Sequence, residues 1–315
     1  MKFDAVILAA GQGKRMKPFN KLISKPMLPI LNKPFLALIV EQLLTLKAER
    51  VIIVASPFNI GEIKDFFDQQ NYSEKINYTI QKEQKGTADA IYTGGLKAVN
   101  EIIFSVAGDN LFSDNFTATM IDEFDKYKID CKCLLALRNV SKEEITKLAS
   151  VELDKNNVVK SITEKPDKNM VVSTLASFSM YIFDKSLLSY FNSVNISTRG
   201  ELEATDAIHN ILSDNIQIKG SITTEDYIHI SNPYDLWKFN MDFLGSKENE
   251  IALNVKLKEK IQLKKCVVGD NVLINENSVL EECVILSNAN IPANSSIKKA
   301  IIGLDEKGAQ EIYTI

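Results

Sequence analysis

The stretch LAAGQGKRMKPFNKLISKPMLPI, residues 8–30, follows a short apolar run and holds two glycines among several cationic side chains. A loop of this kind binds a dinucleotide, binds a nucleoside triphosphate or only turns the chain. The dinucleotide pattern fits poorly, because Met16 stands where a third glycine is needed and residues 53–56 offer no acidic side chain for a ribose. The spacing of a P-loop is absent as well.

A triphosphate-binding loop fits these residues better. Gly11 and Gly13 would let backbone N–H groups approach phosphate oxygens closely. Arg15 offers a planar fork of donors and Lys25 a point charge, and both suit a polyphosphate. Pro26 predicts an extended backbone at Lys25, which would fix the direction of that side chain. The alternative is a solvated basic loop without a ligand, but the spacing favours phosphate binding.

The chain around this loop alternates between the two hydrophobic periods. Strands are predicted at residues 3–9, 50–55, 76–81, 102–107 and 131–137. Helices are predicted at residues 34–47, 61–69, 87–99 and 115–127. Strands separated by such helices form βαβ units, so we expect a largely parallel sheet covered on both faces. Ligands of such sheets lie outside the carboxyl ends of the strands, where the quoted loop and residues 107–110 fall.

The pattern changes twice in the second half of the chain. From residue 150 it becomes strand-rich, with a helix predicted near residues 201–212 and another at 233–244. The last part has a six-residue apolar spacing that shifts once by five, at Val268, Ile274, Leu280, Ile285, Ile291 and Ile297. Hexapeptides in this arrangement predict a short left-handed parallel β-helix, and an ordinary small β-domain is the alternative. We expect one domain over residues 1–245 and the β-helix over 246–315.

Composition excludes several classes of protein. A net charge of −4 over 315 residues disfavours a nucleic-acid-binding protein, which would carry a basic surplus. The apolar run at residues 5–10 is too short for a signal peptide or a membrane span, so we expect a cytoplasmic protein that binds no membrane. The 4 cysteines show no metal-binding spacing and are expected to be buried thiols.

Four motifs in order resemble those of the sugar-phosphate nucleotidylyltransferases. They are the quoted stretch, QKEQKGTADAI at residues 81–91, VAGDN at 106–110 and TEKP at 163–166. The resemblance implies a Rossmann-like three-layer α/β domain with a mostly parallel sheet, and a β-helical extension is common in the family. It also implies a reaction in which a sugar 1-phosphate attacks the α-phosphorus of a nucleoside triphosphate and releases pyrophosphate. Such a transfer needs positioning and cations rather than a protein nucleophile.

The resemblance implies roles for residues of the nucleotide side. Arg15, Lys25 and Asp109 would be the catalytic residues, with Arg15 on the β- and γ-phosphates and Lys25 near the α-phosphate. Asp109 would hold Mg²⁺, or Mn²⁺ in its place. The expected nucleotide-binding residues are Leu8, Ala10, Gly11, Gly13, Arg15, Lys25, Gln81, Gly86 and Thr87. Gln81 can donate to and accept from a base, and Thr87 is also expected to cap the helix that follows it.

The sugar side departs from the family pattern. Glu164 would accept sugar hydroxyls and Lys165 would pair with the sugar phosphate, although a surface Glu–Lys pair is the plain alternative. Ser150 and Ser177 stand where the family often has glycine and asparagine, and both are expected to contact the sugar phosphate. His229 stands where the family has a second metal-ligating aspartate. Since Mg²⁺ prefers oxygen, His229 is either a metal ligand or a neutral buried side chain.

The sequence predicts transfer from UTP or dTTP to a sugar 1-phosphate, with glucose 1-phosphate favoured. The alternatives are cytidylyl, adenylyl or guanylyl transfer to another phosphorylated acceptor, or a non-catalytic regulatory subunit of the same fold. A short β-helix cannot easily bury its open end, so we also expect a homo-oligomer formed through it.

Overall fold

The computed structural model describes residues 1–21, 23–305 and 307–315, and the chain falls into two compact units. The first unit consists of Met1–Gly11 and Ile39–Tyr227, and the second of Gln12–Leu38 and Ile228–Ile315. Most of the quoted loop therefore belongs to the same unit as the C-terminal residues. The domain boundary between residues 245 and 246 stays a prediction.

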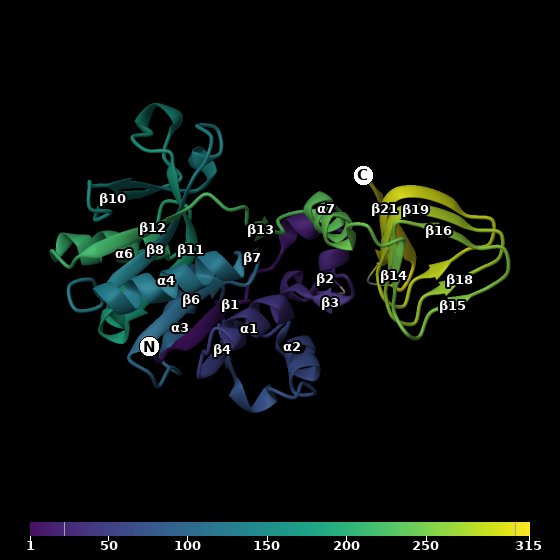
Figure 1. Ribbon diagram of the computed structural model, residues 1–315, viewed down its shortest axis with the longest axis horizontal. Helices are drawn as coiled ribbons and strands as arrows, with labels where there is room; N and C mark the ends of the chain where they lie inside the picture. The colour runs from purple at the N-terminus through teal and green to yellow at the C-terminus, as the bar shows by residue number, and fades with distance from the viewer. Residues whose placement is uncertain (22, 306) are drawn as a thin grey trace. The chain divides into compact units, whose positions relative to one another are not determined.

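The first unit is built on one large mixed sheet (Figure 1). Its parallel half has the order β6–β1–β4–β5, with β1 (Asp4–Leu8), β4 (Arg50–Ala55), β5 (Ile76–Ile80) and β6 (Ile102–Ala107). The other half comprises β8 (Cys133–Asn139), β9 (Ala149–Leu153), β10 (Val159–Glu164), β11 (Leu175–Asp184) and β12 (Ile218–Thr223). Strand β11 runs antiparallel to β6, β8 and β9 and joins the halves, while β12 is parallel to β8. The predicted α/β class is confirmed.

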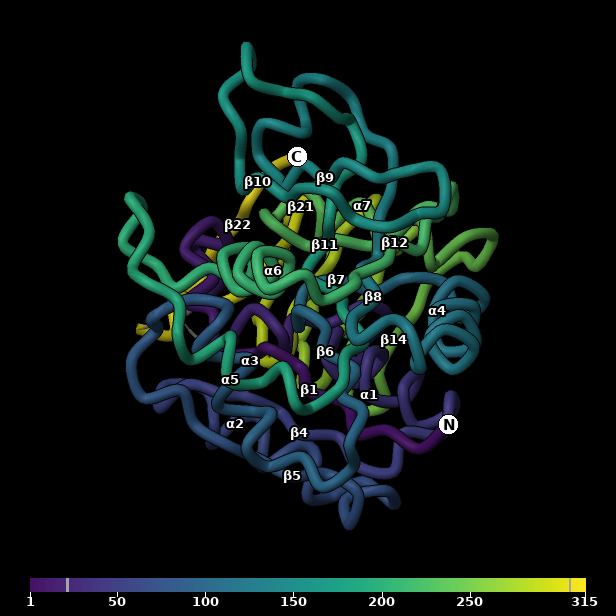
Figure 2. Tube along the Cα trace, turned by 90° about the vertical axis from the view of Figure 1, so that its left-hand side faces the viewer, coloured from purple at the N-terminus to yellow at the C-terminus, as the bar shows by residue number. Residues whose placement is uncertain are grey.

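Helices cover both faces of this sheet. Figure 2 shows α3 (Thr87–Gly95), α5 (Leu188–Asn192) and α6 (Ala204–Ser213) on one side of the strands and α4 (Asp114–Tyr127) on the other. Alternate residues of β1 and β4, such as Val6 and Ile52, bury their side chains in one core cluster with Ile91 and Ile208. This burial at period 2 in the strands and about 3.6 in the helices explains why hydrophobic pattern predicts the elements. The unit also contains α2 (Ile60–Phe67).

Three of the predicted boundaries differ from those in the structure, and hydrogen bonds explain the last two. The helix predicted over residues 87–99 ends at Gly95. The strand predicted from residue 131 begins at Cys133, because the Cys131 N–H still donates to the Tyr127 carbonyl at the end of α4. The helix predicted near residues 201–212 begins at Ala204, because the residues before it pair with another segment, described below.

The C-terminal part of the second unit is a parallel coil. Its strands are β14 (Asn249–Ile251), β15 (Lys256–Leu257), β16 (Gln262–Lys264), β17 (Cys266–Val268), β18 (Leu273–Ile274), β19 (Val279–Ile285), β20 (Asn290–Ile291) and β21 (Ser296–Leu304). Partners in neighbouring coils lie 17 residues apart, as Val268–Ile285 and Leu280–Ile297 show. Spacings of six, six and five residues add up to this repeat, so the β-helix prediction is confirmed; its left-handedness stays a prediction. The hairpin strand β22 (Gln310–Thr314) pairs antiparallel with β21.

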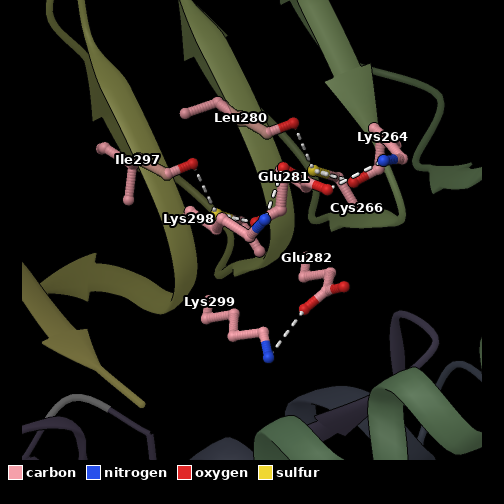
Figure 3. A network of polar contacts seen from close by, with 9 residues as sticks. Lys264, Cys266, Leu280, Glu281, Glu282, Ile297, Lys298 and Lys299 are labelled. Carbon is pink, nitrogen blue, oxygen red and sulfur yellow. Dashed lines mark hydrogen bonds and ion pairs between the residues drawn. The ribbon is translucent and has the colours of Figure 1, made fainter.

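Side chains repeat along the coil with the same period (Figure 3). Glu281 lies between two lysines of neighbouring coils, 2.9 Å from Lys264 and 3.0 Å from Lys298. The buried thiols of Cys266 and Cys283 donate to backbone carbonyls of the next coil, which agrees with the expected free, buried cysteines. Stacking of equivalent positions therefore stabilises both the surface and the core of the coil.

The second unit has further elements besides the coil. It includes the short hairpin β2 (Pro29–Ile30) and β3 (Lys33–Pro34), strand β13 (Ile228–His229) and helix α7 (Pro233–Leu244). Helix α1 (Phe35–Thr45) begins in this unit and ends in the first. Asn232 caps α7 through a reciprocal pair of hydrogen bonds with Asp235, so the predicted helix at residues 233–244 has a well-defined start. Among the residues described, no helix combines the length and apolar character that a membrane crossing requires.

Candidate functional site

The ends of β1 and β6 bring predicted residues of the first unit to one edge of the sheet. The two strands are parallel neighbours, and the Gly108 N–H donates to the Leu8 carbonyl at 2.9 Å. The residues that follow them, Ala10–Gly11 and Asp109, therefore leave the sheet side by side. The side-chain amide of Gln84 donates to the Ala10 carbonyl from a third segment. This edge is where a parallel sheet presents its ligand site.

The predicted base-reading segment is fixed by its own hydrogen bonds. The buried side-chain amide of Gln81 donates to the Gly86 carbonyl at 3.0 Å and to the Asp89 carboxylate at 2.8 Å. Both of its N–H donors are thus engaged within the segment, which favours its carbonyl oxygen for contact with a base. Asp89, which the sequence analysis did not single out, thus orients the Gln81 amide from the first turn of α3, within the same motif.

Thr87 does not have the predicted helix-capping role. It is the first residue of α3, with Gly86 at the cap position, and its hydroxyl oxygen accepts from the Ala204 N–H at 3.0 Å. Two backbone hydrogen bonds join the same segments, from Leu202 to the Lys85 carbonyl at 2.7 Å and from Ala88 to the Leu202 carbonyl at 2.9 Å. The cap prediction was wrong because the donor comes from the start of α6, which only tertiary packing brings close.

We expect Gly86→Ala to weaken nucleotide binding and to destabilise the first unit by about 2–4 kcal/mol. Gly86 has φ 131°, and a Cβ there would lie 2.4 Å from the Leu202 carbonyl oxygen, so neither backbone can stay in place. The thermal midpoint and the apparent Kd for UTP would measure both effects. Gly61→Ala in α2 is the matched control, since a Cβ there meets nothing within 4 Å. Equal behaviour of the two variants would contradict this role of Gly86.

The predicted sugar-side residues also come together. In the sheet Ala149 is the partner of both Glu164 and Ser177, and Ser150 is the partner of Thr163. The Ser150 hydroxyl donates to the Ser173 carbonyl at 2.7 Å. Residues 150, 164 and 177 therefore share one end of β9, β10 and β11. A pocket of about 350 Å³ beside this end is lined by Glu143, Thr146, Lys165, Pro166, Asp167 and Lys168.

Arg199 and Glu203 are two further residues of this region that the sequence analysis missed. The Arg199 guanidinium lies 2.9 Å from Glu203 and 4.0 Å from Glu164, and Lys165 lies 3.3 Å from Glu164. Glu164 is therefore held between two cations. The signal in the sequence is the charged run at residues 199–203, of which the helix predicted near residues 201–212 covers only the last part.

Burial raises the pKa of the Glu164 carboxyl, and the nearby cations only partly oppose this effect. Between its ordinary pKa of 4.5 and the raised value, the folded chain binds more protons than the unfolded chain. The contribution of this carboxyl to the free energy of unfolding is therefore fully present below pH 4.5, and it is lost as the pH rises through the raised pKa. We expect the thermal midpoint of Glu164→Gln, relative to that of the wild type, to be higher at pH 8 than near pH 4. A difference independent of pH would contradict this assignment.

The predicted phosphate-binding residues Gly13, Arg15 and Lys25 belong to the second unit. Gly13 has φ 59°, and a Cβ on it would lie 2.8 Å from the Cβ of Lys25, so the Lys25 stem packs directly against the glycine. Arg15 is exposed in the short helix η1 (Lys14–Met16). The predicted extended backbone at Lys25 is wrong, because Lys25 begins the short helix η3 (Lys25–Met27). Proline is tolerated in a first helical turn, where its missing N–H is not needed.

The residues described contain no group of three or more His, Cys, Asp or Glu side chains arranged to hold a metal ion. A Mg²⁺ ion bound with a nucleotide needs only one or two carboxylates, since phosphate oxygens and water complete its coordination. Asp109 at the sheet edge fits that requirement. His229 lies in β13 of the second unit, and its role as a metal ligand stays a prediction.

Comparison with known proteins identifies the class. The sequence profile of the family described as nucleotidyl transferase matches residues 4–246, so the chain belongs to that family. This confirms the resemblance drawn from the motifs.

Individual relatives agree with this class. The chain is 30% identical over 267 residues to the bifunctional protein GlmU of Methanocaldococcus jannaschii, and the match covers 85% of this chain and 59% of that protein. It thus spans about three-fifths of the length of the GlmU proteins that it matches. It is 28% identical over 233 residues to the UTP–glucose-1-phosphate uridylyltransferase of Bacillus subtilis, covering 66% of this chain and 79% of that protein.

Solved structures share the fold. A UDP-glucose pyrophosphorylase complexed with UDP-glucose superposes with a TM-score of 0.71 at 23% identity, covering 78% of this chain and 100% of the other.

Proposed function

We propose that this protein transfers a nucleotidyl group from UTP or dTTP to a sugar 1-phosphate, with glucose 1-phosphate as the favoured acceptor. The arrangement of Ala10–Gly11 and Asp109 at one sheet edge, where the ends of β1 and β6 meet, is the observation that carries this proposal. The uridylyltransferases among the relatives support the choice of nucleotide and acceptor. We further propose a cytoplasmic homo-oligomer.

The reaction is a displacement at the α-phosphorus with pyrophosphate as the leaving group. Backbone N–H groups of the glycine loop and the charges of Arg15 and Lys25 would hold the phosphates in line for attack. Mg²⁺, when bound, neutralises charge on the phosphate oxygens, and Asp109 is the carboxylate proposed to hold it. The acceptor phosphate supplies its own nucleophilic oxygen, so no side chain needs to form a covalent bond.

Recognition at the two ends of the substrates follows from the contacts described. The Gln81 carbonyl oxygen would accept the imide N–H of uracil or thymine, since its own N–H donors are engaged. Glu164 would accept sugar hydroxyls, and Lys165 with Arg199 would pair with the sugar phosphate. The pyrimidine preference and the sugar preference thus depend on separate segments.

The test is pyrophosphate release with Mg²⁺ across UTP, dTTP, CTP, ATP and GTP, each with and without glucose 1-phosphate. We expect release that depends on both the sugar and UTP or dTTP. Release with another triphosphate would overturn the proposed base and support one of the other nucleotidyl transfers. Tight nucleotide binding without turnover, also with mannose, galactose and N-acetylglucosamine 1-phosphates and with Mn²⁺, would overturn the catalytic proposal in favour of a regulatory subunit.

A further inference from the structure

The loop that carries Arg15 and Lys25 packs against the C-terminal coil. Phe19, at the start of the short helix η2 (Phe19–Lys21), is only 1% exposed. A Cβ on Gly303 of β21 would lie 3.0 Å from Cδ1 of Phe19 and 3.0 Å from Cδ1 of Leu286. The Phe19 ring therefore lies directly over the backbone of β21, in space that exists because residue 303 has no side chain.

A second set of contacts holds the chain that follows the loop. The Asn32 side-chain amide donates to the Val268 carbonyl of the coil at 2.9 Å. Asn240 of α7, fully buried, accepts from the Leu31 N–H and donates to the Pro29 carbonyl, both at 2.9 Å. Helix α7 is itself tied to the coil, since the Trp237 indole N–H donates to the Glu282 carbonyl at 2.7 Å.

Contacts inside the loop connect Phe19 to the cationic residues. The Ile23 N–H donates to the Phe19 carbonyl at 3.2 Å, two residues before Lys25. The Asn20 side-chain amide donates to the Gln12 carbonyl at 3.4 Å, next to Gly13. Gly13 in turn packs on the Lys25 stem. These contacts connect Phe19 to both the glycine turn and the lysine.

We propose that the coil is part of the catalytic apparatus, with Phe19 and Gly303 as positioning residues that hold the triphosphate-binding loop. The proposal rests on the function proposed above for Arg15 and Lys25. It assigns the C-terminal coil a role inside its own chain, separate from assembly of an oligomer. A loop fixed in advance loses less entropy when it binds a triphosphate, so loosening it raises KM for the nucleotide.

The test combines kinetics with amide hydrogen exchange on the full chain. Gly303→Val places methyl groups where the Phe19 ring lies, and we expect a roughly tenfold rise in KM for UTP with an unchanged KM for the sugar 1-phosphate. Amides of residues 12–28 should exchange faster in this variant. Phe19→Ala should act in the same direction by removing the anchor. The double variant should recover part of the loss, because the smaller side chain at position 19 makes room for the larger one at position 303.

Ile291→Val is the matched control, since Ile291 is buried in the core of the coil and its truncation lowers stability without adding bulk at Phe19. An equal rise in KM for UTP in this control, or strictly additive losses in the double variant, would overturn the proposal. So would unchanged exchange in residues 12–28 of Gly303→Val. Failure of the proposed function is recognised separately, because the wild type would then show no sugar-dependent turnover. Faster loop exchange in Gly303→Val would still demonstrate support by the coil in that case.

Discussion

Replacing Asp109 with alanine is expected to lower kcat/KM for nucleotidyl transfer by roughly a thousandfold, which corresponds to about 4 kcal/mol of transition-state stabilisation. The side chain follows β6 at the sheet edge, next to the residues that leave β1. Its removal would take away the carboxylate proposed for Mg²⁺, while the hydrogen bond between Gly108 and Leu8 uses only backbone atoms and remains. The fold should therefore survive.

Two measurements separate loss of the cation from loss of structure. Binding of Mn²⁺ in the presence of UTP, followed by electron paramagnetic resonance, should fall in Asp109→Ala, while the thermal midpoint stays close to that of the wild type. Asp130→Ala is the matched control, because Asp130 is an exposed carboxylate in the turn after α4. Near-normal turnover by Asp109→Ala would show that the metal-binding carboxylate lies elsewhere.

Arg15→Ala should produce the second largest loss, roughly a hundredfold in kcat/KM with UTP. A guanidinium forms paired, charge-assisted hydrogen bonds with phosphate oxygens, and these strengthen as pyrophosphate leaves. Arg15→Lys should recover only part of the rate, because an ammonium cannot make the paired contact. Steady-state kinetics with UTP varied at saturating sugar 1-phosphate would measure both variants.

Lys14→Ala provides the control for Arg15, since both side chains are exposed in the same short helix and carry the same charge. We expect less than a roughly threefold change in this variant. Losses of equal size at both positions would indicate that the loop attracts the triphosphate only by its overall charge. The paired contact assigned to Arg15 would then be withdrawn.

The candidate site was predicted where its determinants are local in the sequence. The glycine turn, the residues after β1 and β6, and the sugar-side strands all carry motifs of consecutive residues. The contacts of Thr87 with Ala204 and of Glu164 with Arg199 were not predicted, because these partners lie far along the chain. A short segment does not specify which distant segment will supply its hydrogen-bond donor.

By itself, the sequence determined the class of fold, the order of most strands and helices, and the parallel coil. These features follow from repeated burial at fixed periods, and the spacing of six, six and five residues already contains the 17-residue register seen in Val268–Ile285. Only the tertiary structure decided what the loop with Gly13, Arg15 and Lys25 packs against. Phe19 contacts Gly303 because the loop and β21 pack closely after folding. Such a contact between two distant segments produces no periodic hydrophobic pattern in either of them.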